Sequence, residues 1–176
     1  DAKVDGDLIF KKDGVEVYLG DSKHKCILYG KNQKGNGEPW CIARDDSDNL
    51  YGRYRFELQR TFYFIIDRNK PVDNQYHAGV IHVRPDGDLS YTNSNNEGDD
   101  TVIFDTLETL YPQLKGQQRL FKHKPITDKE KAAHDASTKD LYNVDNLYDV
   151  FDTYEQVEAY IENNNLSSKQ IENLLN

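Results

Sequence analysis

The run Thr61–Asp67 constrains the fold more than any other feature of this sequence. It reads Thr-Phe-Tyr-Phe-Ile-Ile-Asp, a continuous series of β-branched and aromatic residues with no polar position inside it. Such a series is typical of a strand that is covered on both faces, rather than of a strand with one face in water. The sequence therefore predicts a central strand at this position.

Two hairpins are predicted from their turns. Asp13-Gly14 tolerates positive φ and lies between two apolar runs, which favours a tight turn. Pro85–Asp88 places Pro and Gly where a turn needs them. The strands expected to flank the two turns are 8–10, 15–19, 78–84 and 89–92, which makes the sheet mainly antiparallel.

Helices are expected both before and after the central strand in the sequence. In the segment 45–60, Ser47 is a candidate N-cap, and apolar side chains recur at helical spacing on a face predicted to be buried. These side chains are Leu50, Tyr51, Tyr54 and Leu58. A polar loop is expected over 93–100, followed by a helix that Pro112 shortens. The apolar residues of that helix are Ile103, Leu107, Leu110 and Leu114.

The last third of the chain has a different pattern. Thr127-Asp128-Lys129-Glu130 has the form of a capping box, and helical spacing of apolar residues continues after it. Short helices are predicted around Leu141 to Tyr154, around Val157 to Ile161, and around Ile171 to Leu175. The sequence thus predicts an α+β protein, with a globular domain over 1–120 and a helical C-terminal appendage over 121–176.

The charge limits the kind of partner. The 176 residues include 31 acidic and 22 basic side chains, for a net charge of −9. Non-specific binding to a phosphate backbone needs a concentrated positive surface, so such binding to nucleic acid is not expected. An acidic inhibitor that mimics DNA is an alternative, although acidity is also an ordinary source of solubility.

Further limits come from what the sequence lacks. No apolar run approaches the roughly 20 residues that cross a bilayer, and no signal peptide is recognisable. Cys26 and Cys41 are too few for a zinc cage or a disulfide scaffold, although they could form one bridge. Because the chain begins with Asp1 and contains no Met, we expect a fragment or a processed product of a larger polypeptide.

A series of motifs runs from Cys26 to about Asp100. A Tyr-Gly segment precedes a Trp-Cys box, and a Tyr-x-x-Tyr element begins ten residues after the Cys; two apolar strands and an Asn-rich turn follow. The residues are Tyr29-Gly30, Pro39-Trp40-Cys41-Ile42, Tyr51 to Tyr54, Phe62–Ile66, Val80–Val83 and Asn93–Asn96. This order resembles an uncharacterised domain that is frequent in predicted proteins of tailed bacteriophages.

The resemblance implies a phage setting, either in the host cytoplasm or associated with the virion, and it implies no mechanism. Glu38-Pro39 stands where that family has Thr-Lys before the Trp, and the preceding loop is longer here. Any role of that Lys is therefore not carried over to this chain.

Cys41 is the candidate nucleophile, because a nearby imidazole could take up its proton. His82 and His77 are the candidate partners, on a strand predicted beside the central one. The alternative interpretation is that Cys41 is a small buried apolar residue packed beside Trp40, since free cysteines are among the most buried residue types.

Aromatic and basic side chains gather after the Trp-Cys box. They combine ring faces with guanidinium forks, a chemistry suited to phosphate, nucleotide or carboxylate groups. The candidate binding residues are Trp40, Tyr51, Arg53, Tyr54 and Arg55. The alternative is that these rings belong to the core, and for Trp40 we predict burial against the central strand. The Gly- and Asn-rich loop 30–39 before the box is expected to be exposed and easily cleaved.

Metal and cofactor signatures are incomplete. Asn93–Asp99 has oxygen-bearing side chains at alternate positions, as at the start of a calcium loop, but Phe104 occupies the position where Glu is needed. No Gly-rich phosphate loop, nucleophile elbow or His-Glu-x-x-His pair occurs, so neither a cofactor nor a metal is predicted. The sequence favours a non-enzymatic binding or structural module with a protein partner, and a Cys41-dependent enzyme is the alternative.

Overall fold

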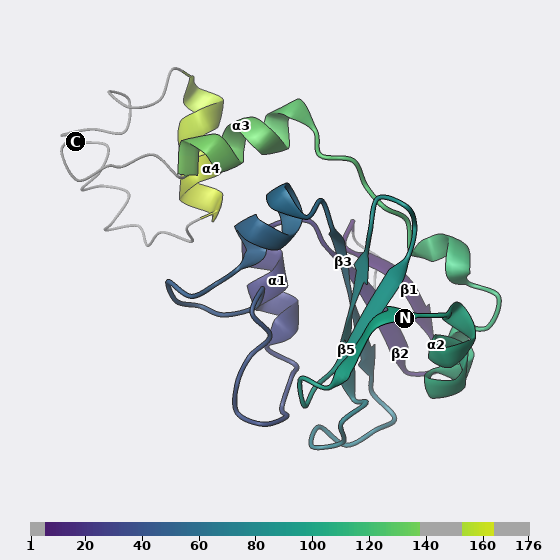
Figure 1. The fold of residues 1–176 in the computed structure, drawn as a ribbon. Coiled ribbons are helices and arrows are strands. Elements are labelled where there is room, and N and C mark those ends of the chain that lie inside the picture. The colour runs from purple at the N-terminus through teal and green to yellow at the C-terminus, as the bar shows by residue number, and fades with distance from the viewer. Residues whose placement is uncertain (1–5, 138–152, 164–176) are drawn as a thin grey trace. The chain divides into compact units, whose positions relative to one another are not determined.

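The computed structural model describes residues 6–137 and 153–163 and has the α+β fold that the sequence predicts (Figure 1). Six strands form one antiparallel sheet in which the order in space follows the order in the chain. The strands are β1 (Leu8–Lys12), β2 (Val15–Gly20), β3 (Thr61–Asp67), β4 (Ala78–Val83), β5 (Leu89–Asn93) and β6 (Gly98–Val102).

The helices of the described ranges are short. They are α1 (Lys23–Gly30), the π-helix η1 (Arg53–Glu57), α2 (Phe104–Leu110), the 3-10 turns η2 (Pro112–Leu114) and η3 (Gln118–Leu120), α3 (Asp128–Ser137) and α4 (Tyr154–Asn163). None of them is long and apolar enough to cross a membrane.

The run Thr61–Asp67 is the central strand that its composition predicts. All 7 residues of β3 are buried, and the strand pairs with β2 on one side and β4 on the other. Figure 1 shows α1 on one side of the sheet and α2 on the other. Successive side chains of a strand point to opposite faces, so β3 contributes to two separate cores.

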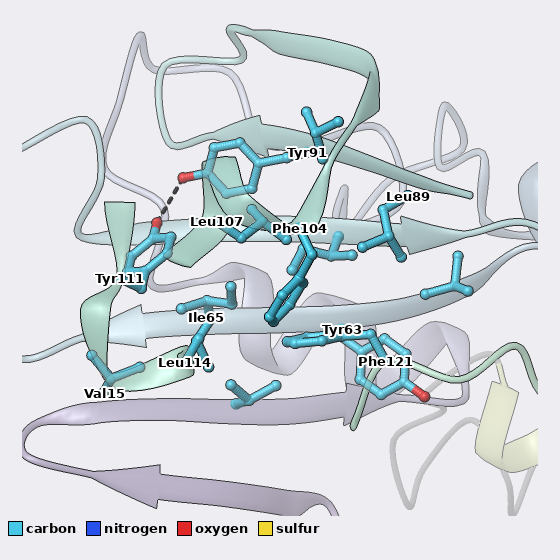
Figure 2. Packing of buried hydrophobic residues seen from close by; sticks show 14 of the residues in the cluster. Val15, Tyr63, Ile65, Leu89, Tyr91, Phe104, Leu107, Tyr111, Leu114 and Phe121 are labelled. Atoms are coloured by element: carbon cyan, nitrogen blue, oxygen red, sulfur yellow. Dashed lines mark hydrogen bonds between the residues drawn. The ribbon is translucent and has the colours of Figure 1, made fainter. Parts of the chain in front are cut away.

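The first core lies under α2 and the 3-10 turns. Tyr63 and Ile65 of β3 meet Leu107 of α2 and Leu114 of η2 there, as Figure 2 shows. Tyr91 and Tyr111 bring their hydroxyl oxygens to 2.6 Å inside this core. The Tyr111 hydroxyl donates to the carbonyl of Tyr76 at 3.1 Å, so this buried pair is anchored to the backbone.

The second core lies on the opposite face of the sheet. Phe62 and Phe64 of β3 pack there with Trp40 and Tyr51, and with Cys26 of α1. The Trp40 and Phe64 ring centroids are 5.9 Å apart, and those of Tyr51 and Phe62 are 5.5 Å apart. The predicted burial of Trp40 against the central strand is confirmed. The segment that carries Trp40 is a loop.

Both predicted hairpins are confirmed. Asp13 and Gly14 have φ values of 44° and 84°, so the β1–β2 turn uses the left-handed conformations that these residue types tolerate. Gly87 has a φ of 90° in the turn between β4 and β5.

The helix predicted over 45–60 is wrong in its extent. Regular helical structure starts only at Tyr51, and Leu58 N–H donates to Arg53 C=O in the wider π pattern. Before it, Asn49 binds the carbonyls of Ile42 and Arg44 through its amide and accepts from Tyr51 N–H. These side-chain bonds compete with a helix. Leu50 precedes the helical residues and Leu58 is the C-cap of η1, and both side chains are exposed instead of buried.

The segment predicted as a polar loop over 93–100 contains the start of a sixth strand. Residues 94–97 form a turn, and β6 follows with its first four residues exposed. An exposed edge strand of sequence Gly-Asp-Asp-Thr-Val has no alternation of apolar residues, so the sequence pattern missed it. The Asn93 side-chain oxygen accepts hydrogen bonds from the N–H groups of Asn95 and Glu97, so this side chain stabilises the turn.

The helix after β6 is confirmed in part. α2 ends at Leu110, and Pro112 opens η2, as the shortening by this proline predicts. Ile103 is predicted as part of the helix but precedes it as its N-cap and is 68% exposed.

Contacts divide the chain into two compact units. Among the described residues, one comprises 6–21 with Lys25–Pro125, and the other Ser22–His24 with 126–137 and 153–163. In the second unit α3 packs with α4. The capping box before α3 is confirmed, because Glu130 N–H donates to Thr127 Oγ1 at 3.1 Å and Thr127 N–H to Glu130 Oε2 at 3.4 Å. The helix predicted near Val157 is α4, while most of the segment 141–154 and all of 171–175 lie outside the described residues.

The loop 30–39 is tied to the β5–β6 turn. Gln33 donates to the carbonyl of Ser94 at 2.8 Å and accepts from Trp40 N–H at 2.7 Å. A Cβ on Gly35 would lie 1.7 Å from the Ser94 carbonyl oxygen, so only glycine fits at this approach. Lys31 and Lys34 are exposed, as expected for this loop, but its backbone is held at several points.

Candidate functional site

Three of the five predicted binding residues are buried. Trp40 and Tyr51 belong to the second core, and the Trp40 indole N–H donates to the carbonyl of Asn93 at 3.0 Å. Arg55 is also buried, although it carries a charge. Its Nη1 atom donates to the carbonyls of Arg60 and Lys124 at 3.0 and 2.9 Å. Arg55 thereby joins the segment before β3 to the segment that follows η3.

The remaining two predicted residues point elsewhere. Arg53 is exposed on η1, two residues from Arg55, and side chains two apart on a helix do not share a face. Tyr54 is half-buried and turns towards β4, where its ring lies edge-on to His82 with centroids 5.4 Å apart. The predicted set is therefore not brought together at one place, and only Tyr54 faces the cluster described next.

Cys41, Tyr54, Arg60 and His82 form a cluster on the second face of the sheet, and we call these four residues the thiol–arginine cluster. The Arg60 guanidinium lies over the Tyr54 ring, 5.3 Å from its centroid. Its Nη1 atom is 3.4 Å from Nδ1 of His82. The Cys41 thiol and the Tyr54 hydroxyl also influence each other: Tyr54 lowers the pKa of Cys41, and Cys41 raises the pKa of Tyr54. The cluster thus gathers residues from the Trp-Cys turn, from η1, from the position just before β3 and from the end of β4.

The imidazole of the cluster is held neutral. Burial, followed by the charges of Arg60 and Arg84, lowers the pKa of His82 to about 3. Since the guanidinium of Arg60 can only donate, Nδ1 of His82 accepts and the ring proton resides on Nε2. A base with so low a pKa is a poor acceptor for a thiol proton near neutral pH.

The thiol is held neutral as well. Burial raises the pKa of Cys41, and the Tyr54 hydrogen bond and the charge of Arg60 offset this only in part. A catalytic thiolate needs the opposite shift. The electrostatics of the cluster therefore oppose a thiolate–imidazolium pair between Cys41 and His82.

His77 lies at the other end of β4. Its Nδ1 atom is 2.8 Å from the carbonyl oxygen of Lys70, and its own carbonyl accepts from Asp67 N–H at 2.7 Å. Five residues of extended chain separate it from His82, which corresponds to roughly 16 Å. His77 thus closes the loop between β3 and β4, far from the thiol–arginine cluster.

Arg60 and Arg84 are the residues that the sequence reasoning missed. Thr61 pairs with Val83 at the ends of β3 and β4, so Arg60, one residue before Thr61, and Arg84, one residue after Val83, lie at the same end of the sheet. Arg84 reaches the edge strand, where it donates to the carbonyl of Asp100 and to Thr101 Oγ1, the latter at 3.5 Å. A sequence signal existed, since a basic residue stands at the outer end of each of two strands predicted as neighbours.

Within 6–137 and 153–163, no group of three His, Cys, Asp or Glu side chains could hold a metal ion. The two cysteines are free thiols.

No family model, curated protein or solved structure matches the chain.

Proposed function

We propose that this protein is a non-enzymatic binding module that acts through a protein partner in a bacteriophage setting. The setting rests on the resemblance of the Trp-Cys box and the motifs after it to the phage domain. The observation that carries the non-enzymatic part is the neutral state of the two groups that a cysteine enzyme would ionise. The pKa of Cys41 is raised, and that of His82 is lowered to about 3.

The charge supports a protein partner rather than a nucleic acid. With a net charge of −9, the chain would repel a phosphate backbone, whereas a protein surface can offer compensating basic side chains. The surface loops are also built for recognition, since exposed polar loops held on a rigid sheet are a frequent form of binding surface. The loop 30–39 has this form, because Asn36 and Gln33 fasten it to the turn at Asn95 and Ser94.

The pH dependence of Cys41 alkylation by iodoacetamide tests the non-enzymatic part. We expect the rate to rise continuously up to and beyond pH 9, because the thiol ionises only above its ordinary range. Cys26 is fully buried and should stay unmodified in the folded protein, which provides an internal control. A plateau of fast alkylation at pH 6 to 7 that disappears in His82→Gln would instead show an activated thiol.

Affinity capture tests the partner. The immobilised protein should retain a defined phage or host protein in a fixed ratio, and Gly35→Ala should weaken retention by displacing the loop 30–39 from the turn at Ser94. Gly6→Ala is the matched control, because a Cβ at Gly6 meets nothing within 4 Å. Retention that is equal in both variants would argue against recognition by this loop.

A further inference from the structure

Arg60 precedes and Arg84 follows the last residue pair of β3 with β4, Thr61 with Val83, so the two positive charges lie at the same end of the sheet. Like charges on neighbouring strands destabilise a sheet when they come close together. The proximity is also seen in the pKa of Arg60, which burial and then the charge of Arg84 lower. Two neighbouring guanidinium groups therefore destabilise the folded protein unless a negatively charged group lies close to them.

The described residues supply no ion pair for the two guanidinium groups. In the described ranges neither Arg60 nor Arg84 has a carboxylate oxygen within ion-pair distance. Arg60 meets an aromatic ring and a neutral imidazole, while Arg84 meets a backbone carbonyl and a hydroxyl. Asp100 acts on Arg60 only through its charge, as a weak influence that raises the pKa.

Arg60, Arg84 and His82 have hydrogen-bond donors that the described residues do not use. A guanidinium carries five N–H groups, of which Arg60 spends one on His82 and Arg84 uses two on β6. The Nε2–H of His82 makes no hydrogen bond to any described residue. These planar, fixed donors match the oxygens of a carboxylate or a phosphate, and the Tyr54 ring holds one of the two forks in position.

We propose that Arg60 and Arg84, together with His82, form a binding site for one oxyanion group, a carboxylate or a phosphate. The surroundings favour a single group over a chain of phosphates, because the exposed carboxylates of Asp86, Asp88 and Asp99 lie on the neighbouring turn and edge strand. The inference deepens the proposed function, on which it rests: the site would receive an anionic group of the partner.

The experiment is an NMR titration of the isolated protein, followed through the Nε–H signals of Arg60 and Arg84. Inorganic phosphate and acetate are added separately at constant ionic strength, with chloride as the balancing anion. We expect saturable shifts of both arginine signals with at least one of the two probes. The probe that saturates at lower concentration identifies the oxyanion class.

Variants assign the effect to the pair. Arg84→Gln should weaken binding at least tenfold, and Arg84→Lys should restore only part of it because the fork is lost while the charge stays. Arg119→Gln, which changes an exposed arginine on η3, should bind as the unchanged protein does. Shifts that follow chloride equally well, or that persist in Arg84→Gln, would overturn the proposal.

The two proposals fail in different measurements. A thiolate plateau in the alkylation of Cys41 would refute the non-enzymatic function while leaving anion binding in place. A flat titration would refute the anion site without bearing on the thiol.

Discussion

The indole nitrogen of Trp40 donates a 3.0 Å hydrogen bond to the backbone carbonyl of Asn93. This bond joins the Trp-Cys turn to the end of β5, while the ring of Trp40 packs on Phe64 in the central strand. The two interactions fix a loop segment on the sheet that supports the thiol–arginine cluster. Trp40 is thus a structural anchor.

Replacing Trp40 should therefore destabilise the fold. Trp40→Ala removes a large buried side chain and should lower the free energy of unfolding by about 3–5 kcal/mol. Trp40→Phe keeps most of the packing but loses the bond to Asn93, so a loss of about 1–3 kcal/mol is expected. Urea denaturation followed by far-UV circular dichroism measures both, since Trp40 is the only tryptophan and fluorescence is lost with it. An unchanged midpoint for Trp40→Ala would contradict the buried position.

The paired tyrosines of the first core should respond unequally to loss of their hydroxyls. Tyr111 donates to the Tyr76 carbonyl, so Tyr91 must donate to Tyr111. Tyr111→Phe leaves two buried groups without partners and should cost about 1–3 kcal/mol, whereas Tyr91→Phe leaves the bond to Tyr76 intact and should cost less. A double-mutant cycle by urea denaturation measures the coupling between the two hydroxyls. If the losses of stability in the two single variants simply add up in the double variant, the coupling is contradicted.

Stability should depend on pH through His82. The pKa of this residue is about 3 in the folded protein and about 6.5 in an unfolded chain, so only the unfolded state takes up the proton between these values. The contribution of the neutral His82 to the free energy of unfolding is present in full above pH 6.5, and it is lost as the pH falls towards 3. Between pH 7 and pH 5 the loss amounts to about 2 kcal/mol.

His82→Gln is the comparison for this effect, because its amide oxygen can still accept from Arg60 while the titrating group is gone. The variant should lose less stability between pH 7 and pH 5 than the unchanged protein, as judged from urea midpoints at each pH. Two outcomes would refute the neutral state of His82 in the folded protein. One is an equal loss of stability in the two proteins, and the other is an imidazole NMR signal of His82 that titrates near pH 6.5.

The bonds of Gln33 should control trypsin cleavage in the loop 30–39. Gln33→Ala removes the acceptor for Trp40 N–H and the donor to Ser94, so cleavage after Lys31 and Lys34 should become at least severalfold faster. The measurement is limited proteolysis under native conditions with mass analysis of the first fragments. Gln118→Ala, at an exposed position on η3, serves as the control. If the unchanged protein is cut in this loop as fast as Gln33→Ala, the loop is not held by these bonds.

The sequence by itself determined the central strand, both hairpins, the capping box at Thr127 and the α+β class. Each of these follows from local physical chemistry, namely β-branched and aromatic runs, turn residues that accept positive φ, and a side chain that caps a helix end. The burial of Trp40 followed in the same way, because the apolar face of β3 had to be covered by nearby apolar residues.

Only the tertiary structure decided the rest. β6 is a strand because β5 offers it a pairing edge, and its own residues carry no apolar pattern. The π-helix at Arg53–Glu57 follows a segment that Asn49 ties to the Trp-Cys turn, and a 3.6-residue period anticipates neither feature. Arg60 and Arg84 lie 24 positions apart in the chain and become neighbours only through the register of β3 with β4. These contacts join positions that are far apart in the chain. They are set by the packing of the whole sheet, and the spacing of residues within a short segment does not predict them.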